Sequence, residues 1–127
     1  MKAFREAVEA NDLQAIEALL SEDVVFRSPA VFTPYEGKAA AMHILRNVIE
    51  VFENFHYVTE AGSPDSPDSV LVFEAEVDGK KLTGCDILHV GPDGLIDDFM
   101  VMVRPLNGLM ALATAMRERL TAPGAGH

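Results

Sequence analysis

Two alternating apolar runs meet at an Asp-Gly pair in the second half of the chain, and they predict a β-hairpin. Residues 70–90 read VLVFEAEVDGKKLTGCDILHV. Asp-Gly between strand-like runs is a strong signal for a two-residue hairpin loop, so Val77 should lie opposite Lys80 and Leu71 opposite Asp86. Side chains alternate between the two faces of a strand. The more apolar face therefore carries Leu71, Phe73, Ala75, Val77, Leu82, Gly84, Asp86 and Leu88.

Apolar residues at helical spacing predict four helices. Asn11, with Gln14 three residues later, has the pattern of a capping box and is expected to cap the second helix. Asn107 is expected to cap the last helix. The predicted helices cover residues 2–10, 12–20, 37–52 and roughly 107–120.

The remaining apolar runs predict strands. Most of these strands follow one another directly and do not alternate with helices. The expected order is two helices, a short strand, a helix, four strands that run mostly as hairpins, and a final helix. This order predicts an α+β domain, in which a curved, mostly antiparallel sheet packs helices on its concave face and encloses space for a ligand. We expect one domain over residues 1–120 and a flexible tail over 121–127. The predicted strands outside the hairpin are 24–28, 55–61 and 95–104.

Composition and charge exclude several classes of binding partner. The chain has 127 residues and a formal net charge of -10, with no visible basic patch, which disfavours nucleic acid and anionic membranes. No apolar run approaches the length of a membrane span, and the charged N-terminal segment is unlike a secretory signal, so a cytoplasmic location is expected. Cys85 is alone. The histidines lack the spacing of a metal site, so we expect no metal and no cofactor.

Asp86 is the candidate for chemistry, because it is the sole ionisable residue on the apolar face of the hairpin. Burying a carboxylate is costly unless it is hydrogen-bonded or protonated. One interpretation is an acid with a raised pKa in a ligand pocket, acting as proton donor or hydrogen-bond donor. The other is a buried carboxyl that backbone amides or a tyrosine hydroxyl satisfy, with a role in packing alone.

Four local motifs resemble the cone-shaped fold of nuclear transport factor 2 (NTF2), ketosteroid isomerase and the SnoaL-like polyketide cyclases. They are NDLQAIEALLSEDVVFRSP, YEGKAAA, CDILHVGPDGLIDDF and VMVRP. The resemblance covers residues 1–120 and implies an NTF2-like cone. It leaves the activity open, because one fold hosts many functions.

The resemblance implies roles for three positions. Asp86 matches the isomerase residue that stays protonated and donates to the developing oxyanion. Ser28 stands where that family has its aspartate base, and Phe4 stands where it has its oxyanion tyrosine. Because a serine cannot abstract a carbon-bound proton unaided, steroid isomerisation by that mechanism is not expected.

The sequence thus predicts a SnoaL-like domain that binds a hydrophobic small molecule. If it is an enzyme, it is a cofactor-independent isomerase, cyclase or hydro-lyase that uses Asp86. The alternative is a non-catalytic ligand-binding or dimeric interaction protein. The expected pocket-lining residues are Phe4, Phe26, Ser28, Phe32, Leu71, Phe73, Leu88, Phe99, Val101 and Val103.

The direction of Asp97 and Asp98 depends on the turn at 91–94, and the sequence leaves it open. The resemblance favours Asp97 on the inner side near the rim and Asp98 outside. If the side chains of this strand alternate the other way, Asp98 faces inward and can form a carboxylate pair with Asp86.

The apolar residues on the outer face of the sheet predict a homodimer, because they form too large an apolar surface to stay exposed to solvent. Its apolar residues are Val70, Val72, Cys85, Ile87, Met100 and Met102.

Overall fold

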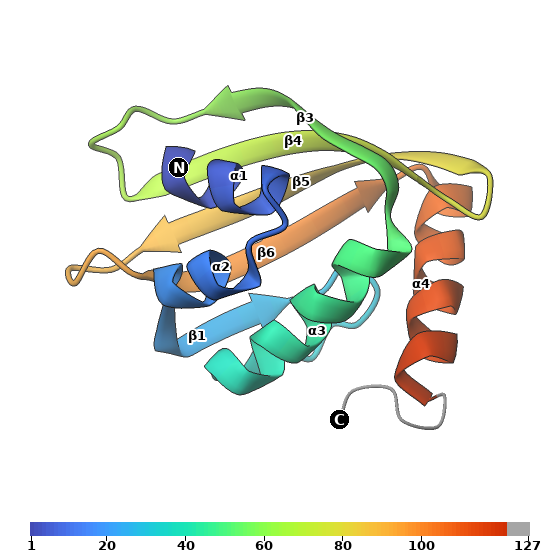
Figure 1. The fold of residues 1–127 in the computed structure, drawn as a ribbon, viewed down its shortest axis with the longest axis horizontal. Helices are drawn as coiled ribbons and strands as arrows, with labels where there is room; N and C mark the ends of the chain where they lie inside the picture. Colours follow the sequence, from blue (N-terminus) through green and yellow to red (C-terminus); the bar gives the residue numbers. More distant parts are fainter. Residues whose placement is uncertain (122–127) are drawn as a thin grey trace.

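A curved six-stranded sheet forms one wall of the protein in the computed structural model, which describes residues 1–121 (Figure 1). The strands are β1 (Leu20–Arg27), β2 (Tyr35–Glu36), β3 (Glu53–Ala61), β4 (Asp68–Val77), β5 (Lys80–Val90) and β6 (Ile96–Arg104). They are ordered β2-β1-β6-β5-β4-β3, and every neighbouring pair is antiparallel except β1 and β6, which are parallel. The predicted α+β class is confirmed.

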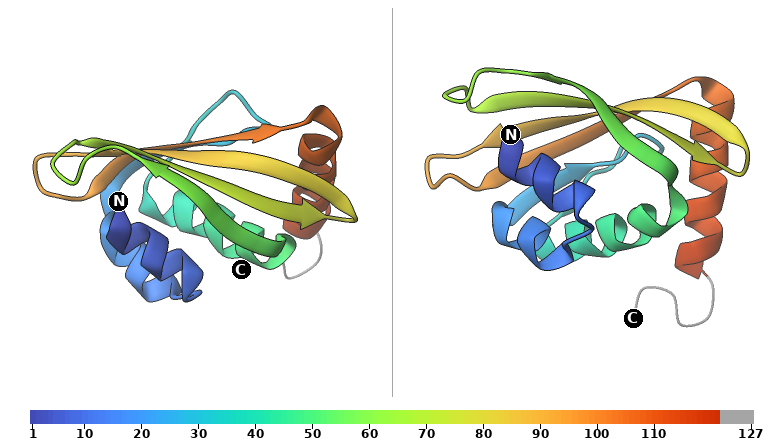
Figure 2. Two further views of the ribbon diagram at one scale, coloured as in Figure 1. Left: turned by 90° about the horizontal axis from the view of Figure 1, so that it is seen from above. Right: turned by 45° about the horizontal axis from the view of Figure 1, so that its top comes forward.

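The helices lie on one side of this sheet. Figure 2 shows α1, α2 and α3 beneath the concave face, with α4 descending from one end of the sheet. Their bounds are α1 (Lys2–Glu9), α2 (Leu13–Leu19), α3 (Lys38–Val51) and α4 (Leu106–Thr121). None of the four helices in residues 1–121 combines the length and apolar character that a membrane-spanning helix requires. The last helix includes Thr121, and the rest of the predicted tail, 122–127, lies outside the described residues.

The predicted hairpin register is confirmed. Val77 pairs with Lys80 and Leu71 pairs with Asp86 across β4 and β5. Asp78 and Gly79, with φ of 50° and 75°, form the loop, since a two-residue hairpin loop of this kind needs positive φ at both positions. The inner face of this hairpin is buried at every position from Leu71 to Leu88 that the alternation predicts.

Both predicted asparagine caps are wrong. Asp12, not Asn11, caps α2, because its side chain accepts a hydrogen bond of 3.1 Å from the backbone N–H of Ala15. Asn11 instead takes a φ of 53° in the tight turn between α1 and α2, a conformation that asparagine tolerates better than most residues. Asn107 lies inside α4, which already begins at Leu106.

A bulge in β6 decides the direction of the two aspartates at its start. His89 pairs with Asp98, yet the next residue of β5, Val90, pairs with Ile96, so β6 carries an extra residue. Ile96 and Phe99 are therefore both buried, while Asp97 and Asp98 face outward between them. The expectation that Asp97 faces the inner side is wrong, and so is the alternative in which Asp98 meets Asp86.

Candidate functional site

A cavity of about 420 Å³ lies between the concave face of the sheet and the helices. Small-molecule sites commonly have this size, with mostly apolar walls and a few placed polar groups. Apolar side chains from α1, α3, α4 and the sheet form most of its wall. The polar lining residues are Asn11, Ser28, Tyr35, Tyr57, Asp86 and Arg117.

Among residues 1–121, Asp86 is the single acidic residue in this wall, and its predicted burial is confirmed. It sits in β5 between Leu71 of β4 and Val101 of β6, and only 6% of it is exposed. The hydroxyl of Tyr57 donates a hydrogen bond of 2.9 Å to Asp86 Oδ2. Burial raises the pKa of Asp86 to about 7, although the Tyr57 hydrogen bond acts in the opposite direction. At neutral pH this carboxyl therefore exists in both protonation states.

Tyr57 reaches Asp86 from two strands away. It lies in β3 beside Phe73 of β4, and Phe73 in turn pairs with Gly84 of β5. The guanidinium of Arg5 lies 5.7 Å from the centre of the Tyr57 ring. Burial, followed by the nearby charge of Asp86, raises the pKa of Tyr57. The phenol therefore remains a hydroxyl and a hydrogen-bond donor throughout the physiological range.

Sequence reasoning did not assign Tyr57 to the site. The alternation of β3 places Tyr57 on the same side as Phe55, and their rings meet edge to face at 5.0 Å. Alternation along the strand predicts this aromatic side. It does not predict that Tyr57 contacts Asp86, because that contact depends on how β3, β4 and β5 align across the sheet.

Six of the ten predicted lining residues line the cavity, and four do not. Leu71 and Leu88 are fully buried in the core without lining the cavity, and Val103 is half-buried outside its wall. Phe32 is wrong as a lining residue, because it is fully exposed in the loop after β1, where strand alternation no longer directs side chains. Those that do line the cavity are Phe4, Phe26, Ser28, Phe73, Phe99 and Val101.

Ser28 and Phe4 bring no ionisable group to the cavity. Ser28 Oγ accepts a hydrogen bond of 3.1 Å from the backbone N–H of Ala30, within its own loop. Phe4 packs edge to face on Phe99, with ring centres 5.2 Å apart. Among residues 1–121, the cavity wall holds no second carboxylate that could serve as a base beside Asp86.

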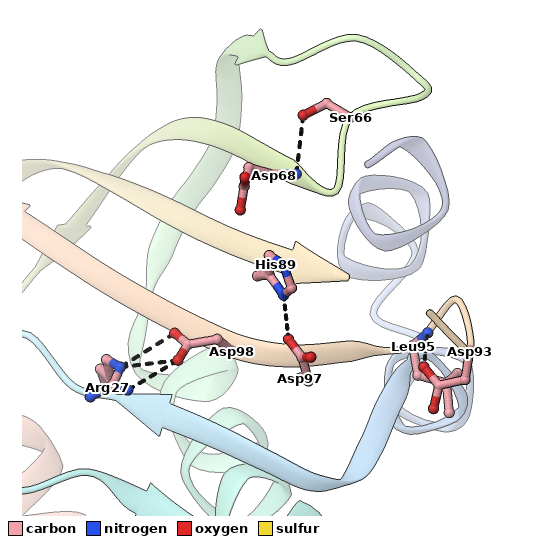
Figure 3. A network of polar contacts seen from close by, with 8 residues as sticks. All are labelled: Arg27, Ser66, Asp68, His89, Asp93, Leu95, Asp97 and Asp98. Carbon is pink, nitrogen blue, oxygen red and sulfur yellow. Dashed lines mark hydrogen bonds and ion pairs between the residues drawn. The ribbon is translucent and has the colours of Figure 1, made fainter. Parts of the chain in front are cut away.

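A separate polar cluster lies on the outer face (Figure 3). His89 Nδ1 lies 2.6 Å from Asp97 Oδ1, and Arg27 Nη2 donates to Asp98 Oδ2 at 3.1 Å. The hydrogen bond to Asp97 raises the pKa of His89. These contacts join β5, β6 and β1 side by side. Within residues 1–121, no three His, Cys, Asp or Glu side chains are arranged to hold a metal ion.

Replacing Tyr57 with phenylalanine tests the hydrogen bond at the site. Loss of the hydroxyl removes the interaction that favours the charged carboxylate, so the pKa of Asp86 should rise above about 7. At alkaline pH the unfolding free energy should fall by about 1–3 kcal/mol, since a buried acceptor loses its donor. Carbon-13 NMR titration of labelled aspartate carboxyls measures the pKa. Tyr35→Phe is the matched control, because Tyr35 lines the cavity without bonding to Asp86; equal pKa values in both variants would contradict the assignment.

Comparison with known proteins places this site in a family. A family of SnoaL-like domains matches residues 1–99. A steroid delta-isomerase from Pseudomonas aeruginosa is 41% identical in its solved structure, with a TM-score of 0.87 over 92% of this chain and 85% of that chain. An uncharacterized protein conserved in bacteria with a cystatin-like fold, from Silicibacter pomeroyi DSS-3, is 32% identical, with a TM-score of 0.89 over 95% and 84% of the two chains.

The fold extends to more distant structures. An NTF2-like protein of unknown function from Mesorhizobium loti is 18% identical, with a TM-score of 0.70 over 83% of this chain and 88% of that chain. No curated protein matches the sequence. The family match and the structures that are 41% and 32% identical agree with the curved sheet and helices that enclose Asp86. The chain belongs to the SnoaL-like, ketosteroid isomerase-like family and has the fold of NTF2-like proteins.

Proposed function

We propose that the cavity binds a hydrophobic small molecule through a carbonyl or hydroxyl oxygen, to which Asp86 donates a hydrogen bond. The observation that carries this proposal is the position of Asp86, buried in the wall of a largely apolar cavity of about 420 Å³. Tyr57 occupies Oδ2 of the carboxyl, which leaves Oδ1 to carry the proton and to face a ligand. A carboxylic acid held in an apolar site is an effective donor to an oxygen that gains negative charge.

Binding of a neutral ketone should depend on the protonation of Asp86. We choose progesterone as the probe, because it is apolar and ends in a conjugated carbonyl. If only the protonated acid binds, affinity should fall about 10-fold between pH 6 and pH 8, given a pKa of about 7. Calorimetric titration measures this change. Asp86→Asn should bind with little dependence on pH, and Asp86→Leu should bind weakly throughout. Strong, pH-independent binding by Asp86→Leu would contradict the proposal.

A proton-transfer enzyme is the second candidate, favoured by the 41% identity to a protein described as a steroid delta-isomerase. In such a reaction Asp86 would stabilise the enolate oxygen of a β,γ-unsaturated ketone. The chain lacks a carboxylate base at Ser28, so its own turnover should be slow.

Ser28→Asp is the matching gain-of-function test. A base at this position should raise isomerisation of a β,γ-unsaturated ketosteroid by about 10-fold or more, since general bases commonly contribute at least that much. The ultraviolet absorbance of the conjugated product measures the rate. Ser28→Asn controls for size, and an equal rate in both variants would favour a binding protein without this chemistry.

We also propose that a second copy of the chain covers the outer sheet face. Met102 is 51% exposed there, and Ile87 is half-buried near the middle of the face. The same face carries Arg27 together with Asp97 and Asp98. In a two-fold dimer the same surface meets itself, so positive charges of one copy can lie opposite negative charges of the other. Sedimentation equilibrium should give a dimer for the native chain and a monomer for Ile87→Lys. A native monomer at high concentration would contradict this proposal.

A further inference from the structure

We propose that the ligand carries an anionic group as well as the oxygen bound at Asp86, and that Arg117 binds this group where the cavity opens to solvent. The inference rests on the proposed function and specifies its ligand class. The ligand would be a hydrophobic acid, with a carboxylate, sulfate or phosphate at one end and a carbonyl or hydroxyl at the other.

Arg117 lies on the cavity face of α4. Helix residues at these spacings share one side, so the residues that line the cavity form a continuous stripe along the helix. The apolar members of the stripe are buried or half-buried, whereas Arg117 is exposed. Arg117 therefore belongs to the solvent-exposed part of the wall, as Asn11, Ala30 and Val31 do, while Asp86 belongs to its buried part. The stripe consists of Leu112, Ala113, Met116, Arg117 and Leu120.

Arg117 also brings a positive charge to the cavity wall. Among residues 1–121, no other Lys, Arg or His lines the cavity. Within the same residues, Arg117 has no carboxylate within the 4.0 Å of an ion pair. In a chain with 20 acidic and 10 basic residues, an arginine that lines a cavity and forms no ion pair within residues 1–121 is available to an outside anion.

A neighbouring arginine has a different task, and it fixes the position of α4. Arg119 forms an ion pair with Glu50 of α3, and its Nε donates a hydrogen bond of 2.8 Å to Asn47 Oδ1. Asn47 is buried and its amide nitrogen donates to the His43 carbonyl oxygen at 2.7 Å. Asn47 and Glu50 of α3 thus contact α4. Because Arg119 holds the helix against α3, the side of α4 that carries Arg117 stays turned towards the cavity.

The two ends of the cavity recognise different chemistry. A protonated carboxyl donates one hydrogen bond to a neutral oxygen, whereas a guanidinium offers a fork of donors that suits a carboxylate, sulfate or phosphate. The apolar wall between Asp86 and Arg117 would hold the body of the ligand. A ligand with both groups would be bound in one orientation, which a purely apolar cavity could not impose.

A matched pair of fluorescent probes tests this inference. Anilinonaphthalene sulfonate and phenylnaphthylamine share one aromatic body, and only the first carries a sulfonate. Titrations would use the full chain, Arg117→Gln and Arg46→Gln, which removes an exposed arginine of α3 that does not line the cavity. Ala113→Phe, which fills the cavity wall, should weaken both probes.

Arg117→Gln should weaken the sulfonate probe about 10-fold and leave the uncharged probe unchanged, because a charge-assisted hydrogen bond is lost. Arg46→Gln should change neither. Added salt should weaken the sulfonate probe in the native chain and have little effect in Arg117→Gln.

An unchanged ratio of the two affinities in Arg117→Gln would overturn the inference and leave the proposed function standing. The same loss in Arg117→Gln and Arg46→Gln would also overturn it, since general surface charge would then explain the binding. Failure of both probes to bind the native chain, or equal binding by Ala113→Phe, would instead count against the proposed function itself.

Discussion

Replacing Asp86 with asparagine is expected to stabilise the protein at alkaline pH, by roughly 4 kcal/mol at pH 8 and above. The folded state holds the Asp86 proton with a pKa of about 7, raised from 3.8 by burial. Between these two values the folded chain binds more protons than the unfolded chain, so the unfolding free energy falls as pH rises. Above about pH 7 the penalty for the buried charge is complete. Asparagine avoids that penalty and still accepts the Tyr57 hydrogen bond.

Urea denaturation at pH 4 and pH 8 measures this effect. The native chain and Asp86→Asn should have similar unfolding free energies at pH 4, where Asp86 is protonated in the folded state. Their difference should appear as pH rises towards 7 and remain constant beyond it. Asp65→Asn, at an exposed loop position, is the control and should change stability little at either pH. A difference between native and Asp86→Asn that stays constant with pH would mean that the buried carboxyl is not the cause.

A group that lowers stability at physiological pH calls for a functional reason. An asparagine would fill the same space at a lower energetic cost, but it has no proton to give up and a weaker hydrogen-bond donor. The chain nevertheless has an acid at this position, in contact with the cavity. This contrast between stability and chemistry supports a role for Asp86 in ligand binding more strongly than its burial alone.

The sequence predicted those features that depend on near neighbours. The Asp-Gly loop fixes the pairing of β4 with β5, and strict alternation then determines that Asp86 faces inward. The long helix α3 begins after Gly37, as predicted, because its apolar residues recur at helical spacing. Both signals are local, and each involves a regular period that an irregular loop does not interrupt.

The features that were missed require contacts between distant segments or an interrupted period. The bulge at Asp97 adds one residue to β6, which an alternation pattern cannot detect. The Tyr57–Asp86 contact spans 29 positions and depends on two strand registers. Arg117 was not assigned to the cavity at all, because only the packing of α4 on α3 determines which of its sides faces the sheet.

Gly84→Ala is expected to destabilise the protein by about 3 kcal/mol and to reduce the cavity, because it overfills a tightly packed site. Gly84 lies on the inner face of β5 directly beneath the Phe73 ring. A Cβ there would overlap this ring, at 2.8 Å from Cε2, and would lie 2.9 Å from the Met102 carbonyl oxygen. The backbone oxygen cannot move without disturbing β6. The Phe73 ring, which lines the cavity, would have to shift into it.

The double variant Phe73→Leu/Gly84→Ala separates overpacking from a general effect of alanine in β5. Leucine removes part of the obstructing ring, so adding the methyl group should cost at least about 1 kcal/mol less in this background than in the native chain. Some penalty should remain, because the Met102 oxygen keeps its position. Urea denaturation of the native chain, Gly84→Ala, Phe73→Leu and the double variant gives the four unfolding free energies. Progesterone titration of the same four proteins measures how each change affects binding in the cavity. Additive losses of stability would show that the ring does not oppose the new methyl group. The close packing of Phe73 on Gly84 would then not be what positions the aromatic wall beside Tyr57 and Asp86.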